Sequence, residues 1–433
     1  MVNLAEQKQK ANQLRKTGAF EEALQLYRSL WEGEGDKFDG AGLLHCLRKL
    51  GLFDEAVVFA NELIDKYPDF DWCRREVIWT LISGQLNKLE ETEPFEKVLQ
   101  TAQGIMDLNP DDLAKKKVVF KVLKSAKSSN HWKIVNKWVV NIDPASLSTK
   151  PMTDSLGREG WCDQSLWYNY RINGLIEQGD PKEAIVLVDE ILERFPKQRK
   201  FFLRLKALAN HFLGNFPESE KIYQELCNRH KPDWWLLHEY AKVVRDMGRK
   251  EDALKLMYQA ATSNPKLESM VSLFADIGML CKTLELYSDA RTHLALCEYI
   301  RKEKGWHVPE SITDTIDELN RAIGNNDKSP SLKEALIICR IVWTKLLGKD
   351  NKPKELSHTK YKVKKGLAGV VNLRSSDRPY CFINSEGDQS FFCFKYDLPA
   401  DTKDGSEVIF DAIPSFDKKK NKESWRASNV RLC

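Results

Sequence analysis

A short phrase recurs along most of this 433-residue chain at intervals of about 34 residues. Each copy has a glycine or polar turn, often an acidic residue, and then one small residue. The clear copies place that small residue at Ala23, Ala56, Ala184, Ser219, Ala253 and Ala290. Ala23 and Ala56 lie 33 positions apart, and Ala184, Ser219 and Ala253 follow one another at 35 and 34. A fixed period of this length indicates a repeat array rather than one ordinary core.

The phrase has a simple physical interpretation. Two antiparallel helices need a tight turn, which glycine makes at low steric cost. Only Ala or Ser fits where two helices cross closely, and a large residue one turn later, such as Tyr27 or Tyr223, fills the space beside the next repeat. A proline after the second helix, such as Pro68 or Pro196, stops it.

These residues resemble the tetratricopeptide repeat family, whose period is about 34 residues. The resemblance implies a mainly α-helical solenoid of about eight repeats over residues 1–308, with a peptide or protein partner on its concave face. Two of the eight copies are weak. One carries Phe95, Val98 and Ala102, and the other carries Trp132 and Val135 without a turn glycine. The segment around 145–163 is expected to be a loop inserted between repeats.

The pattern changes after Trp306. Helix-start signals at Pro309 and at Ser331 with Glu334 predict two capping helices over residues 309–348. Residues 349–360 are charged, contain a proline and show no periodicity, which predicts a basic linker between domains. Five short apolar runs then predict the strands of a small closed β-barrel over residues 361–433. These runs are 367–373, 380–383, 391–394, 407–413 and 428–432.

The barrel segment resembles a cold-shock domain, which has an OB-type fold. The second strand of that family is matched by residues 378–383, the third by 391–394, and the final strand by 427–430. The resemblance implies that bases of single-stranded RNA or DNA stack on exposed rings. Because residues i and i+2 of a strand share a face, Tyr380 and Phe382 should point the same way, with Phe391 and Cys393 beside them and Phe392 turned inward. The predicted nucleic-acid contacts are Tyr380, Phe382, Phe391, Phe394, Arg378, Lys362, Lys364 and Lys395, with Lys365 as a further phosphate contact.

The barrel departs from the family pattern at four positions. Leu373 stands where the family has a tryptophan, and Cys393 stands where it has a histidine. Pro379 and Cys381 stand at the family's two motif glycines. Such changes weaken a stacking surface or convert it into a protein-docking face. Two hypotheses therefore stand: an adaptor whose barrel binds single-stranded nucleic acid, and a purely protein-binding scaffold subunit whose barrel is a second docking module.

The charge distribution points to the same end of the chain. From Ser357 onward there are 14 basic and 10 acidic residues, so this segment holds the whole net charge of +4. Basic residues also crowd the solenoid at Lys197, Arg199, Lys200, Arg204 and Lys206, and at Lys117, Lys121 and Lys124. A basic stripe on a solenoid can bind RNA, but a solvated helix face is the commoner explanation of such groups.

Other site classes are not favoured. The ten cysteines include no CxxC pair, so neither a zinc site nor a disulfide framework is expected. Phosphate-binding, metalloprotease, serine-hydrolase and kinase motifs are missing. Arg204 and His211 are spaced loosely like a pair in some helical ribonucleases, but they lie inside a repeat. We therefore expect a non-enzymatic protein without cofactor or metal. The polar start and the lack of a long apolar window predict a cytoplasmic location without membrane contact.

Overall fold

The computed structural model describes residues 4–33, 35–90, 93–228, 231–263, 266–323, 332–346, 364–373, 380–385, 387, 389–399, 401–417 and 422–432. The chain divides into two compact units, Met1–Leu332 and Lys333–Cys433. The first is helical and the second contains a β-barrel, and each is described by itself below.

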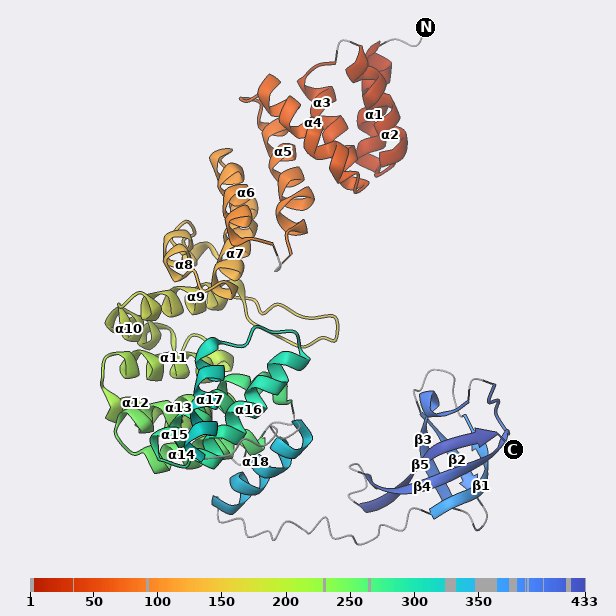
Figure 1. Ribbon diagram of the computed structural model, residues 1–433. Coiled ribbons are helices and arrows are strands. Elements are labelled where there is room, and N and C mark those ends of the chain that lie inside the picture. The colour runs from red at the N-terminus through yellow and green to blue at the C-terminus, as the bar shows by residue number, and fades with distance from the viewer. Residues whose placement is uncertain are drawn as a thin grey trace. The chain divides into compact units, whose positions relative to one another are not determined.

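The first unit is a series of helix hairpins. Among its described residues, helices α1 to α16 follow one another as eight antiparallel pairs, and Figure 1 shows successive pairs stacked side by side. The pairs are α1 (Leu4–Thr17) with α2 (Phe20–Glu32), α3 (Lys37–Lys49) with α4 (Phe53–Lys66), α5 (Asp71–Gly84) with α6 (Phe95–Asp107), α7 (Asp112–Ser128) with α8 (Trp132–Val139), α9 (Asp163–Glu177) with α10 (Pro181–Ile191), α11 (Arg199–Phe212) with α12 (Phe216–Cys227), α13 (Trp234–Asp246) with α14 (Lys250–Ser263), and α15 (Val271–Thr283) with α16 (Tyr287–Glu303).

The turn inside most pairs has one geometry. Gly18 has φ +86°, the Gly18 N–H bonds to the Arg15 carbonyl, and the next N–H reaches back to Leu14. These two hydrogen bonds close the end of α1, and the turn needs a residue with left-handed backbone geometry. The same turn follows α3, α9, α11 and α13 on a glycine. Asn130 and Glu285 hold this left-handed position after α7 and α15, with φ of 59° and 62°. The weak repeat without its glycine therefore uses Asn130, a residue type that tolerates this conformation.

The small residues lie where helices cross. All six phrase positions are fully buried: Ala23, Ala56, Ala184, Ser219, Ala253 and Ala290. Glycines make some crossings still closer. A Cβ at Gly42 would lie 2.4 Å from the Tyr27 ring, and one at Gly278 would lie 2.6 Å from Leu294. The repeat phrase therefore records close helix packing, and the mainly α-helical repeat fold is confirmed.

Two further features extend the first unit. The segment between α8 and α9 contains a short 3-10 turn, η2 (Pro144–Ser146), and a small hairpin bridged at Thr153 and Glu159. Helix α17 (Glu310–Ile323) packs against α16.

Helix α18 (Leu332–Leu346) belongs to the second unit and buries Ala335, Cys339 and Trp343. Within the described residues, no helix is long and apolar enough to cross a membrane.

The barrel has five strands, so the predicted closed five-stranded barrel is confirmed. The strands are β1 (Lys364–Asn372), β2 (Tyr380–Ser385), β3 (Gln389–Phe394), β4 (Glu407–Asp417) and β5 (Lys422–Leu432). The sheet closes in the order β1-β2-β3-β5-β4, with β4 pairing back to β1. The β3–β5 pairing is parallel and the others are antiparallel. The predicted linker, 349–360, lies outside the described residues.

The barrel core is small and complete. Alternate residues of β1 to β4 point inward, whereas the two buried residues of β5 lie three positions apart around Asn429, which has φ +52°. The buried side chains of the core are Val371, Cys381, Ile383, Phe391, Cys393, Val408, Phe410, Ala412, Ala427 and Val430. The rings of Phe391 and Phe410 meet at 5.1 Å between centroids. Gly369 is required on β1, because a Cβ there would lie 2.7 Å from Ile383 and 2.8 Å from a backbone oxygen.

Candidate nucleic-acid interface

Four aromatic side chains share the outer face of β2 and β3, which we call the ring face: Tyr380, Phe382, Phe392 and Phe394. Tyr380 pairs across the strands with Phe394, and Phe382 pairs with Phe392. Neighbouring ring centroids lie 4.9–6.1 Å apart, and all four side chains are half-buried. The face is therefore a continuous aromatic surface on a rigid sheet.

Strand alternation builds this face. On β2, Cys381 and Ile383 point into the core and are fully buried, which turns Tyr380 and Phe382 outward. Directly opposite residues of an antiparallel pair lie on the same side of the sheet. The partners of the two outward rings on β3 must therefore also face outward.

This register corrects the predicted orientation of β3. Phe391 and Cys393 were expected beside Tyr380 and Phe382, with Phe392 inside. Phe391 is only 2% exposed and Cys393 is 0% exposed, whereas Phe392 lies on the ring face. The expectation was wrong by one residue, and a shift of one residue turns every side chain of a strand to the other face. Phe391 is therefore a core residue, and Phe392 was the ring that sequence reasoning missed.

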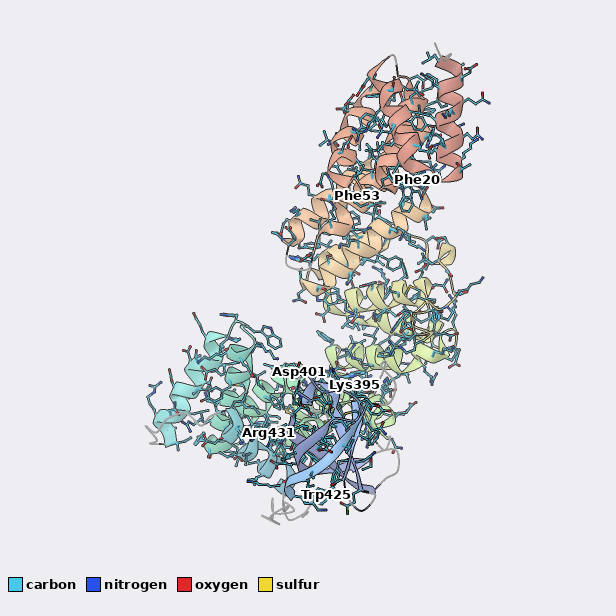
Figure 2. The ribbon with its side chains drawn as sticks, turned by 90° about the vertical axis from the view of Figure 1, so that its right-hand side faces the viewer. Phe20, Phe53, Lys395, Asp401, Trp425 and Arg431 are labelled. Carbon is cyan, nitrogen blue, oxygen red and sulfur yellow. The ribbon has the colours of Figure 1, made fainter. Side chains whose placement is uncertain are left out.

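The predicted basic contacts are only partly beside the rings. Lys395 directly follows Phe394 in the short turn η5 (Lys395–Asp397). Lys364 begins β1, pairs with Ala412 on β4, and holds its ammonium 4.6 Å from the Trp425 ring. Figure 2 labels Trp425 and Lys395 on the barrel. The structure does not bring Lys364 to the ring face. Arg378 and Lys362 lie outside the described residues.

Arg426 on β5 was not predicted. Its Cα pairs with Phe392 across the parallel β3–β5 ladder, and its guanidinium carbon lies 5.6 Å from the centroid of the Phe394 ring. The sequence signal that could have found it is the alternation of β5, where buried Ala427 turns its neighbour outward.

The ionisable groups of the barrel core are not reactive. Burial raises the pKa of the Cys393 thiol to about 12, and burial also raises the pKa of Cys381, its direct cross-strand partner. Both thiols therefore stay protonated at neutral pH and act as small apolar side chains beneath the ring face.

The basic residues around α11 are paired with acids. Each of the five basic residues around α11 meets a carboxylate: Lys197 with Glu159, Arg199 with Glu193, Lys200 with Asp233, Arg204 with Glu239, and Lys206 with Asp189. Lys121 on α7 donates to the Leu89 carbonyl at 2.7 Å. The group around α11 is thus a set of ion pairs and not a bare cationic stripe. Three of the five pairs join residues about one repeat apart in the sequence.

The Arg204 and His211 pair is likewise engaged. Arg204 Nε donates to Glu239 at 2.8 Å, and His211 Nε2 lies 2.8 Å from an Asp246 carboxylate oxygen. Both partners lie on α13, so the pair ties two repeats together. Among the described residues there is no cluster of three His, Cys, Asp or Glu side chains that could hold a metal.

A buried ion pair of the same kind lies between α3 and α5. Burial opposes ionisation of Glu76, but the hydrogen bond from His45 and the charge of Arg48 outweigh it and hold the pKa of Glu76 at about 2. The Arg48 Nη2 to Glu76 oxygen distance is 2.6 Å. This group stabilises the contact between repeats.

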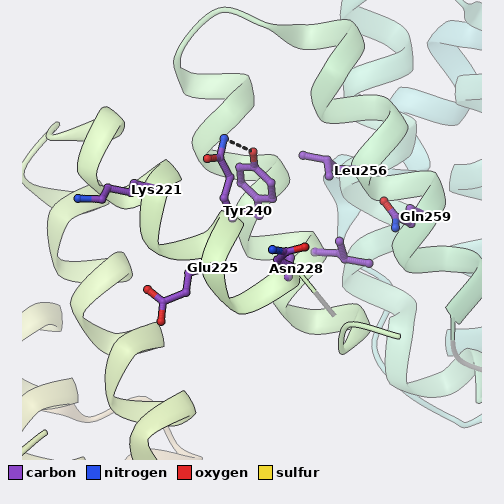
Figure 3. Close-up of a pocket in the computed structure, with 9 residues that line it drawn as sticks. Lys221, Glu225, Asn228, Tyr240, Leu256 and Gln259 are labelled. Atoms are coloured by element: carbon purple, nitrogen blue, oxygen red, sulfur yellow. Dashed lines mark hydrogen bonds between the residues drawn. The ribbon is translucent and has the colours of Figure 1, made fainter. Parts of the chain in front are cut away.

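The first unit also has shallow grooves between second helices of adjacent pairs. One of about 500 Å³ lies beside α12, α13 and α14, where Gln224 donates to the Tyr240 hydroxyl at 3.2 Å, as Figure 3 shows. Cys227 lines it, and burial raises the pKa of that thiol to about 11, so it is not an activated nucleophile. This groove offers no catalytic arrangement.

Comparison with known proteins gives a family match over part of the chain. Residues 201–331 match a family described as a domain of unknown function (DUF7017). The match covers α11 to α17 and does not reach the barrel. No curated protein matches this chain.

Solved structures similar to this chain are repeat proteins of low identity. One is a tetratricopeptide repeat protein from Parabacteroides merdae, 14% identical, covering 73% of this chain and 98% of that chain, with a TM-score of 0.33. Another is the Cut9-Hcn1 hetero-tetramer of the APC/C, 14% identical, covering 75% and 58%, with a TM-score of 0.37. A third, a thermophilic TPR protein of Thermus thermophilus, is 14% identical, covers 56% and 100%, and has a TM-score of 0.22. These scores are low, so the repeat fold rests on the helix pairs and turns described above.

Proposed function

We propose that this chain is a non-catalytic adaptor whose barrel binds single-stranded nucleic acid on the ring face and whose solenoid binds a protein partner. The observation that carries the proposal is the set of four outward rings in cross-strand register on β2 and β3. Every base has a flat π-face, so a row of rings binds single strands with little sequence preference.

The barrel topology supports an OB-type, cold-shock-like assignment. A five-stranded barrel in the order β1-β2-β3-β5-β4, with β3 and β5 parallel, places β2 and β3 side by side. In OB-type barrels the face of strands 2 and 3, with the loops between strands 1 and 2 and between strands 4 and 5, contacts oligonucleotides. The rings lie on those two strands.

The strength of binding follows from the size of the ring face. Each base stacked on a ring contributes roughly 1–3 kcal/mol. Two cross-strand rows give room for few bases, so we expect weak binding by the barrel alone, on the order of 10 µM. A second modest contact through the solenoid would raise the overall affinity when both partners belong to one assembly.

The solenoid's protein partner is proposed from its repeat architecture. We expect the first helices of the pairs to line the concave face that holds a peptide or protein. The paired basic groups around α11 favour a protein over nucleic acid on this unit, because their charge is already compensated. A cytoplasmic location remains a sequence-based prediction.

A second candidate function is a protein-docking barrel. Leu373, which stands at the family's tryptophan position, is part of the core packing rather than an outer ring, so the ring face has one aromatic fewer than the family pattern implies. An apolar face without that ring could equally hold a protein segment.

One experiment separates the two candidates. Full-length protein is titrated into a labelled, unstructured single strand of about ten nucleotides, a length within the range of one OB-type barrel. Binding that weakens as salt rises supports the nucleic-acid proposal, because neutralised phosphates release counterions. No binding at low salt, together with a nuclease-resistant protein complex recovered through the barrel, would support the docking candidate instead.

A further inference from the structure

Arg426 borders the ring face on the side away from β1. It lies on β5, which runs parallel to β3, and its partner in the ladder is Phe392. Its guanidinium lies against Phe394 at 5.6 Å. Among the described residues this puts a positive charge in direct contact with the aromatic cluster.

The guanidinium is incompletely bonded. Within the described part of the chain, Arg426 forms no ion pair, and its Nε is enclosed without a hydrogen-bond partner. Asp397 on η5 and Arg426 both act electrostatically on the pKa of the Cys393 thiol, yet they form no ion pair with each other. Leaving a buried donor unbonded destabilises the folded state, and each such group in a native structure calls for an explanation.

The basic residues around α11 in the solenoid show the opposite arrangement. Each of the five meets a carboxylate, including Arg204 with Glu239.

Arg15 and Arg301 in the solenoid also have a buried Nε without a hydrogen-bond partner, and Arg15 lies 4.8 Å from the Trp72 ring. Each of these two arginines donates through an Nη atom, to Asn12 and to the His307 carbonyl. Arg426 differs from them because its side chain forms no hydrogen bond or ion pair within the described residues. The difference coincides with the face proposed to bind an anionic ligand.

The register places four side chains in one row across the sheet. Asn372 on β1 pairs with Phe382, Phe382 pairs with Phe392, and Phe392 pairs with Arg426. Neighbouring strands lie about 4.8 Å apart. A base stacked on Phe392 would therefore lie about one strand spacing from Arg426, which is close enough for the guanidinium to reach the phosphate of the same nucleotide.

We propose that Arg426 binds a backbone phosphate of the single strand, so that the backbone follows β5 while the bases extend over β3 and β2. This inference rests on the proposed nucleic-acid function and adds the orientation of the strand. Arginine suits the role because its planar fork matches two phosphate oxygens. The Arg426 donors that lack a partner in the free protein would then bond to the phosphate oxygens in the complex.

The test is the salt dependence of binding by full-length variants. Each phosphate contact of a single strand contributes a slope of about −0.7 to the plot of log affinity against log salt. Arg426→Gln should weaken binding about tenfold and reduce the slope by about 0.7, whereas Arg426→Lys should keep most of the slope. Arg431→Gln is the matched control, because Arg431 lies exposed on the same strand and pairs with Ile409 instead of a ring.

A second measurement starts from the wild-type protein and changes the nucleic acid instead. Strands just long enough to cover the ring face, so that they cannot shift register, carry one neutral methylphosphonate at successive linkages and are titrated into wild-type protein. One linkage should weaken wild-type binding about tenfold, and that linkage should have no further effect with Arg426→Gln. The inference is overturned if Arg426→Gln leaves the slope unchanged, or if no linkage distinguishes the two proteins. If the wild-type protein binds no strand at all, the proposed function itself fails.

Discussion

Phe382 and Phe392 lie directly opposite each other on β2 and β3, with ring centroids 6.1 Å apart and ring planes at 82°. This pairing fixes the side of the sheet on which both rings lie. It makes Phe392 an outer residue and its neighbour Phe391 a core residue. Two adjacent phenylalanines of one strand therefore have different roles.

The first prediction compares these neighbours. Phe391→Ala should destabilise the barrel by about 3–5 kcal/mol, because it leaves a cavity beside Phe410. Phe392→Ala removes a half-exposed ring and should cost clearly less. Chemical denaturation followed by a signal from the barrel measures both. Equal losses in the two variants would show that the register of β3 is wrong.

The second prediction concerns the helix crossings. Ala184 is fully buried in α10, so Ala184→Phe should overpack the crossing and cost about 1–3 kcal/mol. Ala253→Phe should behave alike in α14. Val186→Phe is the control, because Val186 lies on the same helix as Ala184 and is 58% exposed. A control variant as unstable as the two crossing variants would remove the support for crossings at these positions.

The third prediction is a pH dependence from His293. Burial lowers the pKa of His293 to about 4 despite its hydrogen bond with the Asp289 carbonyl. The unfolded chain, with a pKa near 6.5, binds the proton more readily. Above about pH 6.5 the protonation of His293 takes nothing from the free energy of unfolding. Below that pH the unfolded chain binds a proton that the folded protein does not, so the free energy of unfolding falls as the pH drops towards 4.

The measurement is the free energy of unfolding as a function of pH, compared between the wild type and His293→Gln. The loss of unfolding free energy between neutral pH and pH 5 should be larger in the wild type by roughly 2 kcal/mol. Subtracting the two curves removes the contribution of the carboxylates, which titrate lower. Parallel curves over this range would mean that His293 is accessible to protons in the folded state.

The repeat fold could be predicted because its signals are local. The turn glycine, the small crossing residue and the bulky residue one turn later lie within a dozen positions, as in Gly18, Ala23 and Tyr27. Asn130 and Glu285 take the glycine's place in two turns. Asn130 could have been anticipated from its tolerance of left-handed backbone, whereas Glu285 carries no such signal.

The orientation of β3 could not be predicted from its own residues. Phe391, Phe392, Cys393 and Phe394 are all apolar, so the strand has no alternation to fix which side faces inward. Pairing with β2 decides it, and that pairing is a contact between strands. The carboxylate partners of Arg204 and Lys200 lie 35 and 33 positions away, which is why these residues resembled a bare basic stripe in the sequence.

The central claim is that the ring face binds single-stranded nucleic acid, and the most direct measurement is the affinity of full-length Tyr380→Ala/Phe392→Ala for a labelled single strand. Ile409→Ala is the control, because Ile409 is 47% exposed on β4, outside the ring face. The double variant should lose at least about tenfold in affinity while its barrel stays folded, since two stacking contacts of roughly 1–3 kcal/mol are removed. Wild-type affinity in the double variant, or equal losses in the double variant and the control, would contradict the account.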